Sequence, residues 1–129
     1  MPDQSYILVI EDNDFVRMQI VKFLQDGGYG VYEATNVEQA VDAIRNHKES
    51  IRCMLVDVRM EPADGFDFLN KMQAENISIP AILVTGDQNS DVLSKASNFK
   101  VVSVLMKPVN KDRLLQMVAR AISGSGAAS

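Results

Sequence analysis

The stretch Tyr6-Ile7-Leu8-Val9-Ile10 is an apolar, β-branched run that ends directly in the acidic pair Glu11-Asp12. Two later runs repeat the arrangement, because residues 53–56 end in Asp57 and residues 101–106 end in Lys107-Pro108. Apolar runs of this length are typical of strands buried on both faces of a parallel sheet. The carboxyl ends of such strands lie on one edge, where open α/β sheets bind ligands. The charged residues that follow the runs are therefore expected to converge.

Strand and helix patterns alternate five times along the chain. The strand patterns cover about residues 6–10, 30–33, 52–56, 81–84 and 101–106. Helix patterns cover about residues 14–25, 66–74, 90–96 and 111–122, and a further helix opens with the capping-box pattern of Thr35 and Glu38. Such alternation predicts βαβ units with right-handed crossovers, and therefore an α/β fold with helices on both faces of a parallel sheet.

The bulk composition is that of one globular domain, with 129 residues, 47% hydrophobic, 23% charged and a formal net charge of −4. The acidic balance argues against direct nucleic-acid binding, and no apolar stretch approaches the roughly 20 residues of a membrane span. A single cysteine, Cys53, and the lack of a signal-peptide pattern predict a cytoplasmic location. The domain is expected to cover residues 1–123, with 124–129 as a flexible tail or the start of a linker.

The carboxylates of Glu11, Asp12 and Asp57 would repel one another on one sheet edge, since like charges this close raise pKa values and destabilise the fold. Lys107 or a divalent cation would offset that repulsion, and oxygen ligands suit Mg2+. Phosphoryl transfer requires an in-line nucleophile and charge neutralisation, which an aspartate beside Mg2+ and a lysine provides. Thr85, directly after the strand pattern at 81–84, is placed to donate its hydroxyl to a phosphoryl oxygen.

Other functions of the same topology fit less well. A dinucleotide site would have G-x-G-x-x-G after the first strand, and that motif is absent. A flavodoxin-like nucleotide site would have a hydroxyl- or glycine-rich first loop, whereas Glu11-Asp12-Asn13-Asp14 would repel phosphate. A phosphatase of the haloacid-dehalogenase type would carry a second aspartate two residues after Asp57, where this chain has Arg59. Each strand-end charge taken alone could also be an ordinary solvated residue.

Five motifs in register resemble the receiver domain of two-component response regulators. They are the acidic pair after the first strand, Asp57 after the third, Asp64-Gly65 before the third helix, Thr85 after the fourth strand, and Lys107-Pro108 after the fifth. The resemblance covers about residues 5–123. It implies a doubly wound (βα)5 flavodoxin-like three-layer sandwich, with a parallel five-stranded sheet of order 2-1-3-4-5.

The resemblance also implies a role for each residue of the site. The implied assignments are the phosphoacceptor Asp57, the Mg2+ ligands Glu11, Asp12, Asp57 and the backbone carbonyl of Arg59, and the phosphoryl-contacting Thr85 and Lys107. The chain is then a signal transduction receiver that accepts a phosphoryl group from a phosphohistidine on a histidine kinase or phosphotransfer protein. Its chemistry is limited to self-phosphorylation and autodephosphorylation, so it is not an enzyme in the usual sense.

The alternative is a degenerate receiver that acts only as a protein-interaction module. Neither hypothesis identifies the output partner or domain. Both are compatible with a homodimer through the face formed by the fourth helix, fifth strand and fifth helix. No membrane association and no direct nucleic-acid binding by this domain are expected.

Two features set this chain apart within the resemblance. Val104 stands at the switch position, where the family carries a Tyr or Phe that couples to the site threonine. A valine cannot swing between buried and exposed rotamers in the same way, although Phe99 supplies an aromatic ring nearby in the sequence. Arg59 and Asp87 each follow a site residue by two positions, and we hypothesise that they form an ion pair that limits attack by water. An unchanged dephosphorylation rate after neutralising both side chains would exclude that pairing.

Overall fold

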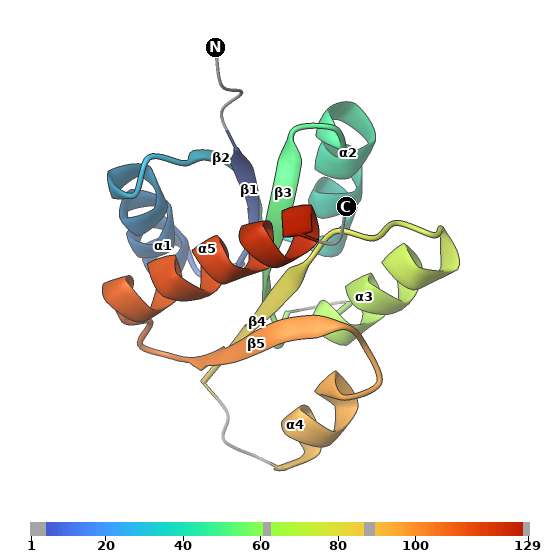
Figure 1. The fold of residues 1–129 in the computed structure, drawn as a ribbon. Coiled ribbons are helices and arrows are strands. Elements are labelled where there is room, and N and C mark those ends of the chain that lie inside the picture. Colours follow the sequence, from blue (N-terminus) through green and yellow to red (C-terminus); the bar gives the residue numbers. More distant parts are fainter. Residues whose placement is uncertain (1–4, 61–62, 87–89, 128–129) are drawn as a thin grey trace.

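The computed structural model describes residues 5–60, 63–86 and 90–127 and shows five strands that alternate with five helices within these residues (Figure 1). In chain order the elements are β1 (Tyr6–Ile10), α1 (Asp14–Asp26), β2 (Gly30–Ala34), α2 (Val37–His47), β3 (Ile51–Asp57), α3 (Gly65–Ala74), β4 (Ala81–Thr85), α4 (Ser90–Ala96), β5 (Val101–Met106) and α5 (Lys111–Ala127). No helix in the described residues is long and apolar enough to cross a membrane.

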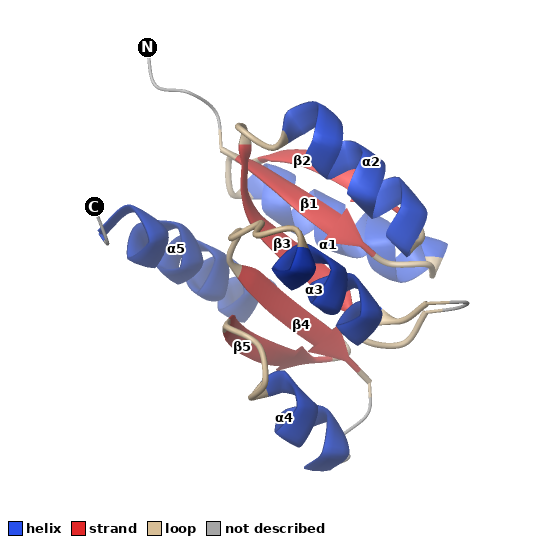
Figure 2. Ribbon diagram, turned by 90° about the vertical axis from the view of Figure 1, so that its right-hand side faces the viewer, coloured by secondary structure: helices blue, strands red, loops and turns tan. Residues whose placement is uncertain are grey.

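The strands form one parallel sheet of order β2-β1-β3-β4-β5. Helices α1 and α5 cover one face, and α2, α3 and α4 lie on the opposite side (Figure 2). This arrangement confirms the predicted doubly wound (βα)5 sandwich. The strand order reverses between β1 and β3, and such a switch point opens a crevice at the carboxyl ends of the strands.

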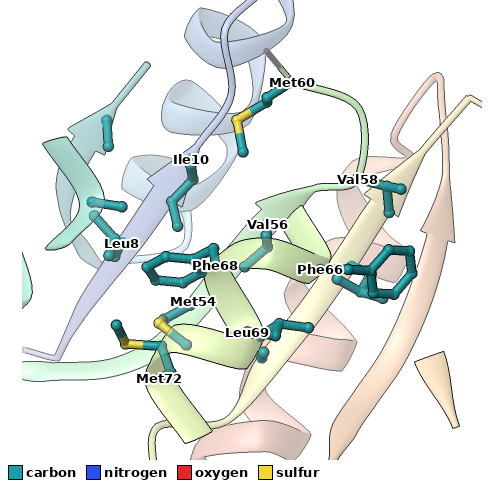
Figure 3. Packing of buried hydrophobic residues seen from close by; sticks show 14 of the residues in the cluster. Leu8, Ile10, Met54, Val56, Val58, Met60, Phe66, Phe68, Leu69 and Met72 are labelled. Atoms are coloured by element: carbon teal, nitrogen blue, oxygen red, sulfur yellow. The ribbon is translucent and has the colours of Figure 1, made fainter. Parts of the chain in front are cut away.

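Two apolar clusters, one on each face of the sheet, hold the three layers together. Side chains of alternating strand residues point to opposite faces, so Leu8 and Ile10 enter one cluster while Ile7 and Val9 enter the other. In the first cluster the ring of Phe68, on α3, lies among strand side chains that include Ile10 and Val56 (Figure 3). Burial of strands on both faces explains why their sequences are continuously apolar.

Cys53 belongs to the second cluster, on the side of α1 and α5. The side chain is fully buried, and burial raises the pKa of its thiol to about 12. Only a deprotonated thiol is reactive, and the raised pKa keeps this thiol protonated. Cys53 is therefore a core residue and not a reactive thiol.

Two helix ends differ from the sequence predictions. The N-cap of α2 is Asn36, whose side chain accepts a hydrogen bond from Gln39 N, while the Gln39 side chain bonds to Thr35. The capping pair is therefore shifted by one residue from Thr35 and Glu38. Helix α5 continues to Ala127, beyond the expected end at residue 122. Glycine has a low helix propensity, but propensity only weakly determines where a helix ends, so the predicted end of α5 was too early.

Candidate phosphoryl-transfer site

The buried polar side chains of the described residues all lie at the carboxyl edge of the sheet. Glu11 follows β1, Asp57 ends β3 and Thr85 ends β4, and these residues are 1%, 2% and 1% exposed. Asp12 is exposed at the same edge. Lys107, directly after β5, extends its side chain to this group. The structure therefore brings together the strand-end residues that the sequence predicted to converge.

Three polar groups of Glu11 are held by hydrogen bonds. Its backbone N–H donates to the carbonyl of Ala34 at 3.0 Å, and its carboxylate Oε2 accepts the Asn13 N–H at 3.1 Å. Its backbone carbonyl accepts a hydrogen bond from Arg17 Nη1 at 3.0 Å. The loop between β1 and α1 is therefore fixed around Glu11 before any ligand arrives.

Lys107 provides the positive charge of the site. Its Nζ lies 3.2 Å from Asp57 Oδ1 and 2.9 Å from Glu11 Oε1. Asp57 Oδ1 also accepts the Arg59 backbone N–H at 3.3 Å. The backbone N–H of Lys107 donates to the Thr85 carbonyl at 2.8 Å, and the Lys107-Pro108 peptide is cis. The ammonium thus lies between the two buried carboxylates.

Burial and the Glu11 carboxylate outweigh the single ammonium in their effect on the pKa of Asp57. Burial, the largest cause, and the neighbouring Glu11 carboxylate together raise the pKa of Asp57 from 3.8 to about 7, while Lys107 partly opposes them. For Lys107, burial lowers the pKa, but the Glu11 and Asp57 carboxylates outweigh burial and leave it raised. The site therefore carries an excess of negative charge that favours a further cation.

The oxygen atoms present fit a small, hard divalent cation. Glu11, Asp12 and Asp57 each offer a carboxylate oxygen, and these atoms lie within 4.8 Å of one another. Among the described residues, the buried Oε1 of Glu11 has no hydrogen-bond partner, although the Lys107 ammonium lies 2.9 Å away as an ion-pair partner. An all-oxygen donor set with room for waters is what Mg2+ prefers.

Gly65 is a site residue whose role the sequence did not reveal. A Cβ atom built at Gly65 would lie 2.5 Å from the Asp57 carbonyl oxygen and 2.9 Å from Val56 Cγ1. Asp64 caps α3 through a reciprocal capping box with Asp67, which places the first turn of the helix against the end of β3. The Asp64-Gly65 pair was visible as a motif, but the close approach that explains it appears only in three dimensions.

The remaining predicted positions lie around this centre. Arg59 is exposed, and Asp87 lies outside the described residues, so the hypothesised ion pair between them stays a prediction. Val104 is half-buried on β5 and packs against the first apolar cluster, to which Phe99 also contributes. The ring of Phe99 stacks on that of Phe66, with centroids 5.9 Å apart.

Asp57→Asn should stabilise the domain at high pH when EDTA removes divalent cations. The folded-state pKa of about 7 lies above the ordinary 3.8, so ionising Asp57 costs stability as pH rises between those values. The difference between the two pKa values is equivalent to roughly 4 kcal/mol of unfolding free energy. Water at the open side of the site screens part of this, so we expect a gain of about 2 kcal/mol at about pH 8. Urea denaturation should show this gain at about pH 8 and almost none near pH 4.

The matched control for this substitution is Asp26→Asn, because Asp26 is an exposed acid paired with Lys111. The control should show no gain at high pH. A gain for Asp57→Asn that did not change with pH would contradict the assigned cause.

Comparison with known proteins identifies the class. The sequence profile of the response regulator receiver domain matches residues 7–119. The chain is 30% identical over 122 residues to the transcriptional regulatory protein FixJ of Bradyrhizobium diazoefficiens, covering 95% of this chain and 58% of that protein. It is 29% identical over 116 residues to a cyclic di-GMP phosphodiesterase of Thermotoga maritima, covering 90% of this chain and 30% of that protein.

Solved structures agree with the sequence comparison. A response regulator receiver protein from Pseudomonas putida superposes with a TM-score of 0.84 at 27% identity, covering 93% of this chain and 99% of that one. A receiver domain from Clostridium thermocellum superposes with a TM-score of 0.89 at 23% identity, covering 97% and 99%. The chain belongs to the response regulator receiver domain family, as the sequence motifs predicted. It spans only 30% to 58% of the length of the two curated relatives described above.

Proposed function

We propose that this receiver domain accepts a phosphoryl group on Asp57 from a phosphohistidine donor, in a Mg2+-dependent reaction, and thereby changes its interaction surface. The observation that carries the proposal is the environment of the Asp57 carboxylate. It is buried at a strand end, 3.2 Å from an ammonium and within reach of two further carboxylates. The donor would be a histidine kinase or a phosphotransfer protein.

In the proposed step a carboxylate oxygen of Asp57 forms a bond to phosphorus as the bond from phosphorus to the donor imidazole nitrogen breaks. The electron pair of the broken bond stays on that nitrogen. Glu11, Asp12, Asp57 and the Arg59 carbonyl would hold Mg2+, which when bound neutralises charge on the phosphoryl oxygens. Lys107 supplies a second positive charge, and the Thr85 hydroxyl donates to a phosphoryl oxygen.

Later hydrolysis of the acyl phosphate returns the domain to its starting state, so the chemistry of the chain is confined to its own aspartate. The two curated relatives named above extend beyond the matched region and differ in activity, so the receiver domain does not by itself specify the output of the whole protein. The acidic balance of the domain supports an output through a protein partner or adjoining domain and not through direct nucleic-acid contact. Formation of a homodimer would be one interaction that the changed surface supports.

The alternative function is a degenerate receiver that only binds partners. Val104 supports it, because a half-buried valine packed on the core lacks the rotamer change of an aromatic side chain. The buried carboxylates and Lys107 support the phosphoacceptor, since an excess of buried negative charge costs stability and has no use in a purely passive module.

Incubation with acetyl phosphate separates the two functions. The phosphoacceptor predicts that intact-mass spectrometry detects one added phosphoryl group with Mg2+, and none with EDTA or in Asp57→Asn. Asp26→Asn, which removes an exposed carboxylate remote from the site, should be modified like the wild-type protein. Absence of modification in the wild-type protein with Mg2+ would favour the degenerate receiver.

A further inference from the structure

Arg17 makes a set of contacts that the proposed chemistry does not use. It lies on α1, and its side chain is only 13% exposed. Its Nη2 lies 2.7 Å from Asp14 Oδ1 and its Nε lies 3.0 Å from Glu33 Oε1, on β2. Its Nη1 donates to the backbone carbonyl of Glu11 at 3.0 Å. The guanidinium thus joins a helix, a neighbouring strand and the loop that carries the acidic pair.

We propose that Arg17 is a positioning residue for the Mg2+ site, an inference that rests on the proposed function. The carbonyl that Arg17 holds belongs to the peptide unit between Glu11 and Asp12. Because that unit is planar and includes the Asp12 Cα atom, holding its carbonyl restrains the orientation of the unit and the position of that atom, from which the exposed Asp12 side chain projects. Arg17 pre-organises Asp12, while the Ala34 carbonyl and Asn13 amide fix Glu11 from its other groups.

A fork of fixed donors is required for this role. The guanidinium is planar and donates in several directions at once, whereas a lysine ammonium is a point charge on a flexible stem. Asp14 and Glu33 hold two edges of the fork and leave the third for the Glu11 carbonyl. Groups that orient metal ligands from outside the coordination sphere commonly change metal affinity about 10-fold to 100-fold when removed.

Positioning and charge make opposite predictions for Mg2+ affinity. Arg17 is a cation near a cation site, so if only its charge mattered, removing it would strengthen Mg2+ binding. Removal would also leave Asp14 and Glu33 without their partner, which adds negative charge and again favours binding. If Arg17 positions Asp12, Arg17→Met should instead weaken Mg2+ binding, by about 10-fold.

The test is isothermal titration calorimetry with MgCl2 alone, without a phosphoryl donor, on the wild-type protein, Arg17→Met, Arg17→Lys and Glu33→Gln. Glu33→Gln removes one partner of Arg17 but keeps the bond to the Glu11 carbonyl, so its affinity should stay within about 3-fold of wild type. Amide NMR spectra should show the Asp12 and Asn13 signals of Arg17→Met displaced while those of β4 are retained. Far-UV circular dichroism checks that each variant is folded.

Mg2+ affinity in Arg17→Met equal to or higher than that of the wild-type protein would overturn the positioning role and leave the proposed function intact. If Arg17→Met does not fold, Arg17→Lys carries the test, because it keeps the charge but lacks the fork. That variant should bind Mg2+ several-fold more weakly than wild type, and equal affinity would overturn the proposal. If the wild-type protein bound no Mg2+, the proposed function itself would fail.

Discussion

Lys107→Met is expected to lower the free energy of unfolding by about 3 kcal/mol at about pH 8 in EDTA, because it leaves two buried carboxylates without a cation. In the wild-type protein the ammonium lies 2.9 Å from Glu11 Oε1 and 3.2 Å from Asp57 Oδ1. Methionine retains most of the side-chain volume, so the loss reflects charge more than packing. Urea denaturation followed by circular dichroism measures the effect.

The loss should shrink as the pH falls. The pKa of Asp57 is already raised to about 7, and removing the ammonium that opposes this shift raises it further. Below that pH the folded protein carries a proton on Asp57, in the variant as in the wild-type protein, so the repulsion that Lys107 relieves is largely gone. The gap between the two proteins should therefore be much smaller near pH 5 than at about pH 8.

Lys111→Met is the matched control, because Lys111 pairs with Asp26 at 3.0 Å on the exposed surface. An exposed pair of this kind contributes about 0 to 1 kcal/mol. Equal losses for the two lysines, or a loss at Lys107 that is the same at both pH values, would contradict the account of the buried cluster.

Gly65→Ala is expected to destabilise the domain by about 3 kcal/mol, although alanine is the better helix former by about 1 kcal/mol. The added Cβ would lie 2.5 Å from the Asp57 carbonyl oxygen and 2.9 Å from Val56 Cγ1. Both atoms belong to the buried end of β3, which has neighbours on both sides in the sheet and cannot withdraw easily. Relief of the clash must move either α3 or the strand end that carries the proposed phosphoacceptor.

Gly86→Ala is the comparison for this substitution. Gly86 follows β4 at the same edge, but its nearest neighbours to an added Cβ are Lys107 Cβ and Cδ at 4.0 Å. That distance is ordinary contact, so the change in unfolding free energy should stay within about 1 kcal/mol. A Gly65→Ala protein as stable as Gly86→Ala would show that the approach of α3 to β3 is not tight.

The fold could be predicted because its strongest signals are local. Strands such as β1 and β3 are buried on both faces and read as continuous apolar runs, and helices with one apolar stripe separate them. The exact caps could not be predicted, because Thr35 and Asn36 are both good capping residues and only the backbone decides between them. The predicted end of α5 was too early for a different reason, because helix propensity only weakly determines where a glycine-containing helix ends.

The charged centre of the site could be predicted because strand ends in a parallel sheet share an edge. Glu11, Asp57 and Lys107 each follow an apolar run, so convergence followed from topology. Gly65 and Arg17 could not be recognised in the same way. Their roles depend on a close backbone approach and on a long side chain that reaches a carbonyl, and neither leaves a periodic pattern in the sequence.

Identifying the residue that carries the covalent phosphoryl group tests the assignment of Asp57 as the phosphoacceptor most directly. Borohydride reduction of the protein after treatment with acetyl phosphate and Mg2+ converts an aspartyl phosphate to homoserine, and peptide mass spectrometry locates the modified residue. Modification at residue 57, absent with EDTA, is the predicted result. Modification at Asp12 or another carboxylate, or no modification of a protein that binds Mg2+, would contradict the assignment of Asp57 as the phosphoacceptor.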